Sequence, residues 1–128
     1  VANGGTSRIE ALWRSLGANP VRTSAAEHDR LMSLVSHLPQ LTANSLAAAL
    51  AAAGVSCDEL GPGGRDMTRL AASSPEMWAP LFESGHPAVI DALRAMAERL
   101  HRMAGELESG DIDAITSLME QTRTWRDV

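Results

Sequence analysis

Two arginines after a glycine-rich stretch are the side chains best suited to bind an anion. The stretch Gly61-Pro62-Gly63-Gly64 precedes an expected helix start, where free backbone N–H groups favour negative charge. Arg65 and Arg69 are four residues apart and would share a helix face. A guanidinium group matches a carboxylate through two parallel hydrogen bonds, so the pattern is typical of carboxylate recognition. Spacing alone favours a simpler alternative, a flexible loop with Arg69 solvated or paired with Asp66.

A second group of polar residues interrupts the longest apolar segment, Glu27 to Ala53. Ser36, His37 and Gln40 surround Pro39. A proline inside a helix removes a backbone hydrogen bond and kinks or breaks the rod. The break is either a packing feature or a device that places polar side chains at a site. By spacing alone, His37 is more simply a hydrogen-bonded histidine at a kink.

The other reactive residue types form no recognisable site. Trp78 is more simply a core residue than the wall of a pocket. The remaining histidines lack the spacing of metal ligands, so we expect no metal site. The glycine stretch lacks the lysine and hydroxyl residue that end a P-loop, and no dinucleotide fingerprint is present.

The composition favours one all-α domain. The 128 residues are 45% hydrophobic and only 3% aromatic, so alanine and leucine must fill a helical core. The formal charge of −5 argues against a nucleic-acid partner. No apolar run is long enough to cross a membrane, and no signal-peptide layout is present. The single Cys57 cannot form an internal disulfide, which fits a reducing, cytoplasmic location.

Capping and stop signals divide the chain into about six helices, expected to begin near Ser7, Ser24, Arg65, Ser74, Pro87 and Asp111. Gly17, Gly54, the Ser84-Gly85 pair and Gly110 are the expected ends. Residues 19–23 look extended and are the candidate for a short strand, although no partner strand is evident. The alanine-rich half after Pro39 would let another helix approach closely, within the domain or across a subunit boundary.

Four motifs, in order along the chain, resemble the C-terminal half of prephenate dehydrogenases and their arogenate-using relatives. They are Glu27-His28-Asp29-Arg30, Ser36-His37-Leu38-Pro39, residues 63–71 and residues 74–78. The resemblance implies an intertwined helical domain that forms a homodimer and closes over the substrate. Residues 24–128 would be this dimerisation and substrate-binding domain. Residues 1–23 would be the last helix and strand of a missing N-terminal Rossmann domain.

The resemblance also implies a reaction in tyrosine biosynthesis. Prephenate or arogenate would lose a hydride to NAD or NADP and then carbon dioxide, and its ring would become aromatic. The family's catalytic histidine and its glycine-rich cofactor motif lie in the N-terminal domain, and neither is present here. We therefore expect this chain on its own to bind no dinucleotide and to carry no catalytic residue.

The resemblance assigns roles to single residues. Arg69 matches the arginine that binds a substrate carboxylate, and Asp66 matches an acid near it. Ser36 and Trp78 match positions that line the substrate pocket. From the residues themselves, and not from the resemblance, His37 is a further candidate for a hydrogen bond to the ligand.

Gln40 departs from the pattern, because many members have a second histidine there. Glutamine is neutral and both donates and accepts hydrogen bonds, whereas imidazole can become cationic. Arogenate carries an amino group where prephenate has a keto oxygen. We expect Gln40 to shift preference toward arogenate or to tolerate both substrates.

Two other functions fit the same residues. One is a stand-alone helical interaction module with no small-molecule site. The other is a sister dehydrogenase that acts on an amino-substituted prephenate. A strand followed by GxGxxG upstream of Val1 would separate an enzyme from a module.

Overall fold

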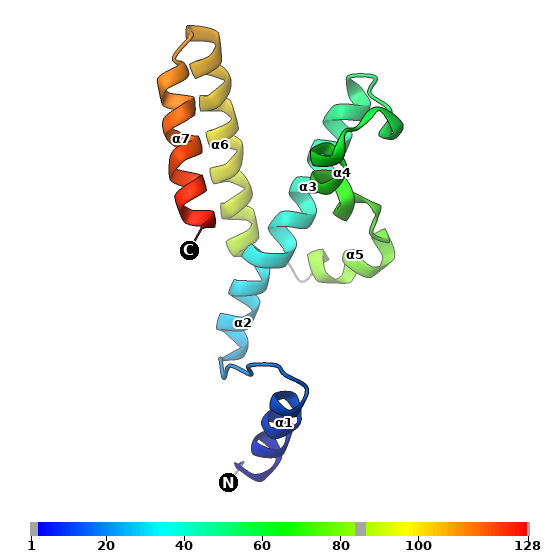
Figure 1. The fold of residues 1–128 in the computed structure, drawn as a ribbon. Coiled ribbons are helices and arrows are strands. Elements are labelled where there is room, and N and C mark those ends of the chain that lie inside the picture. The colour runs from blue at the N-terminus through cyan, green and yellow to red at the C-terminus, as the bar shows by residue number, and fades with distance from the viewer. Residues whose placement is uncertain (1–2, 84–86, 128) are drawn as a thin grey trace.

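The computed structural model describes residues 3–83 and 87–127, and the regular elements in these ranges are all helical. Two arms diverge from a common base, and α1 lies apart from both (Figure 1). This confirms the all-α fold class. The α-helices are α1 (Asn3–Ser15), α2 (Ala25–Met32), α3 (Leu38–Ala52), α4 (Pro62–Thr68), α5 (Pro75–Glu83), α6 (Pro87–Ser109) and α7 (Ile112–Arg126).

The first helix and the segment after it differ from expectation. Helix α1 begins at Asn3, so the predicted start at Ser7 is wrong, because the backbone before Ser7 is already helical. Gly17 ends it with φ +83°, as predicted. Residues 19–23 are extended but form no strand, because no described segment pairs with them. An ion pair between Glu10 and Arg22 holds this segment against α1, and Arg22 lowers the pKa of Glu10 by hydrogen bonding.

A π-helical turn replaces the predicted break in the central rod. Residues Ser33–His37 form this turn, in which the Leu38 N–H donates to the Ser33 carbonyl, five residues back. Pro39 follows directly, in the first turn of α3. The Ser33 side chain is fully buried, and its hydroxyl donates to the Asp29 carbonyl at 2.8 Å. The rod therefore continues from α2 into α3 with a local bulge, a feature often found at functional sites.

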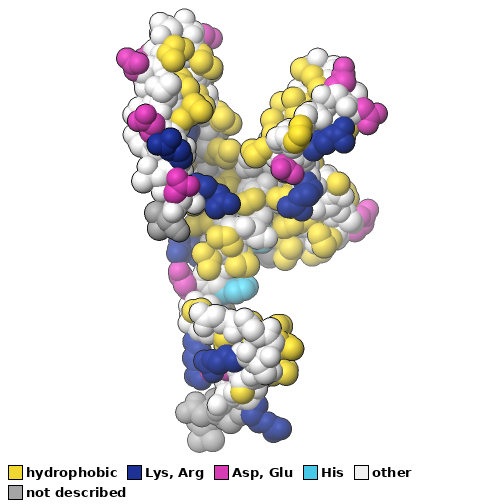
Figure 2. All heavy atoms as spheres, in the orientation of Figure 1, with side chains coloured by type: hydrophobic (Ala, Val, Ile, Leu, Met, Phe, Trp, Pro, Cys, Tyr) yellow, Lys and Arg dark blue, Asp and Glu magenta, His cyan; other side chains and the backbone are white. Residues whose placement is uncertain are grey.

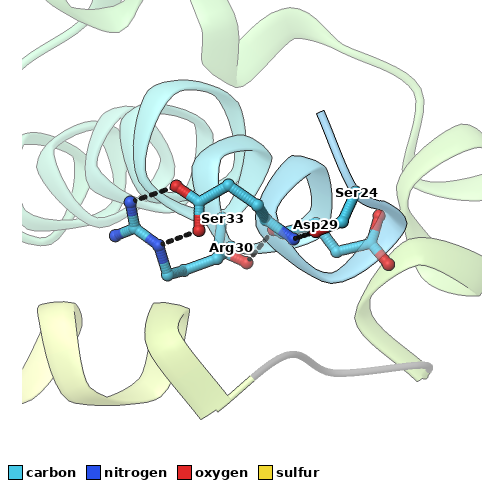
Figure 3. A network of polar contacts seen from close by, with 5 residues as sticks. Ser24, Asp29, Arg30 and Ser33 are labelled. Atoms are coloured by element: carbon cyan, nitrogen blue, oxygen red, sulfur yellow. Dashed lines mark hydrogen bonds and ion pairs between the residues drawn. The ribbon is translucent and has the colours of Figure 1, made fainter. Parts of the chain in front are cut away.

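Ser24 caps this rod as predicted. Its hydroxyl accepts a hydrogen bond from the Glu27 N–H at 3.2 Å. The Glu27 carboxylate turns instead to Arg30, with contacts of 2.7 and 2.9 Å (Figure 3). Only half of the reciprocal capping arrangement therefore forms, and an ion pair one turn along replaces the other half.

Replacing Ser24 with alanine should lower the free energy of unfolding by about 1 kcal/mol, because the Glu27 N–H loses its acceptor. Urea unfolding followed by circular dichroism measures the change. Ser24→Asp is the control, since its carboxylate can accept the same bond at a positive helix end. Equal losses in both variants would show that the cap does not stabilise the helix.

On each of the two arms, a glycine with positive φ ends a helix. On one arm, Gly54 at φ +80° ends the rod, and α4 begins at Pro62 rather than at the predicted Arg65. Proline is pre-organised for a first helical turn, which explains the earlier start. On the other arm, Gly110 at φ +74° turns α6 into α7, and Asp111 caps α7 through the Ala114 N–H at 3.1 Å, as predicted. The expected helix end at Ser84 and Gly85 lies outside the described residues.

A single copy of the chain buries little of its apolar surface. Among described residues, the buried hydrophobic side chains are Ala43 and Val89. The accessible surface is 10065 Å², whereas a compact 13.6-kDa monomer exposes about 6,600 Å². Hydrophobic side chains gather along both arms (Figure 2). The open shape therefore leaves apolar faces that a folded chain normally covers.

The main apolar cleft lies between α3 and α6. It encloses about 550 Å³. Its walls are almost entirely hydrophobic, and Leu46 is a half-buried member of them. The lining residues are Thr42, Ser45, Leu46, Ala49, Met67, Leu93, Met96, Ala97 and Leu100.

Candidate functional site

The π-helical turn places a histidine against two aromatic rings of α5. The His37 ring meets Trp78 edge-on, with centroids 5.8 Å apart and planes at 90°. It meets Phe82 at 6.0 Å and 81°. Trp78 and Phe82 stack at 5.5 Å and 18°. These geometries are favourable for aromatic pairs and fix the imidazole orientation. Ser36, in the same turn, is half-buried.

Gln40 lies one turn further along the rod and is 3% exposed. Its amide nitrogen donates to Asn44 Oδ1 and to the Leu70 carbonyl, both at 2.8 Å. Leu70 belongs to a 3₁₀ turn, Arg69–Ala72, that follows α4. Gln40 therefore connects the central rod to the turn that carries Arg69.

The two arginines singled out by spacing have different environments. Arg65 is committed to the protein, because its guanidinium donates to the carbonyls of Leu60 at 2.8 Å and Asp58 at 3.3 Å. The Arg69 guanidinium is exposed and has no partner among the described residues. The expected alternative pairing with Asp66 does not form; the Asp66 carboxylate is also exposed and unpaired within that part of the chain. Of these two arginines, Arg69 is thus the one available to an external carboxylate.

The structure joins the candidate residues in two groups. His37 contacts Trp78, and Gln40 contacts the neighbour of Arg69. The π-helical turn supplies Ser36 and His37, and the first turn of α3 supplies Gln40. The rod is therefore the element that both groups share.

Sequence reasoning missed two residues that contact the candidate residues. Phe82 lies four residues after Trp78, and Asn44 lies four residues after Gln40. Residues at this spacing are neighbours on a helix face, so the i, i+4 relation would have pointed to both.

Two polar atoms of the site are buried without a partner among the described residues. They are Gln40 Oε1 and Trp78 Nε1. A buried polar group normally has a hydrogen-bond partner.

Several other kinds of site find no support in the described ranges. No group of three or more histidine, cysteine, aspartate or glutamate side chains is arranged to hold a metal ion there. No helix in the same ranges has the length and apolar character needed to cross a membrane. The glycines expected to bind an anion, Gly63 and Gly64, lie within α4, a helix of 7 residues.

The open arms, the sparse core and the polar bulge on the central rod together mark a helical assembly domain. The chain belongs to the prephenate dehydrogenase dimerization-domain family, whose sequence model matches residues 24–121.

Three curated relatives are similar over most of this chain. Prephenate dehydrogenase of Bacillus subtilis is 25% identical over 128 residues, which cover 94% of this chain and 33% of the relative. Cyclohexadienyl dehydrogenase of Zymomonas mobilis is 26% identical over 125 residues, covering 92% and 42%. Prephenate dehydrogenase of Lactococcus lactis is 26% identical over 125 residues, covering 94% and 35%. The chain thus spans 33% to 42% of the length of these relatives.

Proposed function

We propose that the chain is the C-terminal helical domain of a prephenate or arogenate dehydrogenase. The family membership carries this proposal, together with the names of the relatives. The whole enzyme would catalyse oxidative decarboxylation in tyrosine biosynthesis. The ring carbon that bears the hydroxyl group loses a hydride, the ring carboxylate leaves as carbon dioxide, and the ring becomes aromatic.

The cofactor, NAD or NADP, would be bound by a domain outside this chain. The residues here do not fit a dinucleotide, because no GxGxxG pattern is present and the glycine-rich stretch is folded into α4. Residues 1–23 would be the end of that other domain. The separation of α1 from both arms supports this division at about residue 24 (Figure 1).

In this proposal the central rod and the Arg69 turn form one wall of the substrate pocket. Arg69 binds a substrate carboxylate, and Asp66 lies one turn before it on α4. His37, Ser36 and Trp78 line the wall beside it. The observation that supports this assignment most directly is that the exposed Arg69 guanidinium has no partner within residues 3–83 and 87–127, because such a group is available to bind an anion.

A second copy of the chain would complete the fold. The accessible surface exceeds that of a compact monomer by about 3,500 Å² per chain. Two copies together would therefore have about 7,000 Å² to cover, which corresponds to a large obligate interface. The apolar cleft between α3 and α6 is wide enough for side chains of another helix. An intertwined homodimer, in which a helix of each copy fills the cleft of the other, would cover these faces.

Two measurements on the full-length protein test the proposal. Its native mass should correspond to a dimer, and it should oxidise prephenate or arogenate with NAD or NADP, seen as nicotinamide absorbance. A dimer that turns over neither substrate would overturn the substrate assignment, and an amino-substituted prephenate would be assayed next. A monomer with no turnover would support the stand-alone interaction module instead.

A further inference from the structure

Both N–H donors of the Gln40 amide are used within the protein. A glutamine amide has two N–H donors. Here one bonds to Asn44 Oδ1 and the other to the Leu70 carbonyl, each at 2.8 Å. The side chain is 3% exposed, and its Oε1 atom is buried as well. No part of this amide is therefore open to a ligand in the described structure.

The bond to Leu70 acts on the turn that carries Arg69. Arg69 is the first residue of the 3₁₀ turn and Leu70 is the second. Short 3₁₀ turns have poorer hydrogen-bond geometry than α-helices, so an external bond has a large influence on their position. The bond spans 30 residues of sequence and fixes this turn against the rod.

We infer that Gln40 is a positioning residue, which sets the Arg69 guanidinium for the substrate carboxylate and does not itself contact substrate. The inference rests on the proposed function, since it takes Arg69 as the carboxylate ligand. It replaces the expectation that Gln40 selects between arogenate and prephenate by direct contact. The substrate carboxylates are common to both compounds, so a change at Gln40 should affect both equally.

The test uses the full-length enzyme with Gln40→Met, which keeps the side-chain length and removes both donors. KM should rise about 5- to 20-fold for prephenate and for arogenate alike, with kcat changed less than about 3-fold, because misplacing a binding group weakens productive binding. Asn44→Ala is the matched control. It removes one acceptor of the same amide but keeps the Leu70 bond, so its KM should stay within about 2-fold of the parent value. Gln40→His keeps a ring N–H donor and should restore most of the lost affinity.

A double variant shows whether Gln40 acts through Arg69. In an Arg69→Ala background, Gln40→Met should change KM by less than about 2-fold, because coupled residues are not additive. Full additivity would overturn the inference, as would an unchanged KM in a dimeric Gln40→Met enzyme. A loss confined to arogenate would also overturn it, because Oε1 would then accept from the substrate amino group. If Arg69→Ala alone leaves KM unchanged, the proposed substrate site fails instead, and the two failures are distinguishable.

Discussion

Replacing Arg69 with alanine is expected to raise KM for the substrate by about 30- to 1,000-fold in the full-length enzyme. This corresponds to the roughly 2–4 kcal/mol lost when one partner of a close charge pair is removed. The guanidinium has no partner among the described residues, so its removal breaks no contact within that part of the chain. Steady-state kinetics measures the effect, and the melting temperature should not fall.

Arg65→Ala is the matched control for this experiment. It removes the same side chain four residues earlier, but Arg65 bonds the carbonyls of Leu60 and Asp58. Its loss should lower stability by about 1 kcal/mol and leave KM unchanged. Arg69→Lys should fall between the parent and the alanine variant, because an ammonium group keeps the charge without the two-pronged geometry. If KM rises equally in both alanine variants, Arg69 has no special role.

The second large effect is expected from Leu46→Asp, which should convert the dimer to a monomer. Leu46 lies on the wall of the apolar cleft between α3 and α6. If a second copy fills this cleft, the variant buries a carboxylate with no partner, at about 3–5 kcal/mol for each site. A two-fold interface contains the change twice. Sedimentation analysis at micromolar concentration measures the shift in mass.

Ala25→Asp provides the control, because it adds the same charge on an exposed residue at the start of α2, outside the cleft lining and outside the alanine-rich half of α3. It should remain dimeric. Leu46→Ala should weaken folding or the dimer by about 2–5 kcal/mol if partner contacts bury the side chain fully. A Leu46→Asp protein that stays dimeric would place the interface elsewhere.

Local signals in the sequence predicted the helices well. The serine cap at Ser24, the aspartate cap at Asp111 and the glycine ends at Gly54 and Gly110 all form as predicted. Each of these caps and helix ends depends on residues within about four positions of one another, so the local sequence includes every residue that takes part. The errors have two kinds of cause, a local one at the helix starts and a non-local one at the expected strand. The helix starts at Asn3 and Pro62 precede the predicted ones, and residues 19–23 lack a strand partner.

The sequence by itself determined the all-helical class and the family, because caps, apolar periodicity and ordered motifs are short-range patterns. The resemblance had already singled out Arg69, and the tertiary structure added a physical difference from Arg65. Arg65 donates to the carbonyls of Leu60 and Asp58, whereas Arg69 has no partner among the described residues.

The tertiary structure alone showed that Pro39 follows a continuous π-helical turn rather than a break. It also gave Gln40 its partner in Leu70, 30 residues away. Such a bond depends on how the rod packs against a distant turn, and no spacing along the chain encodes that contact.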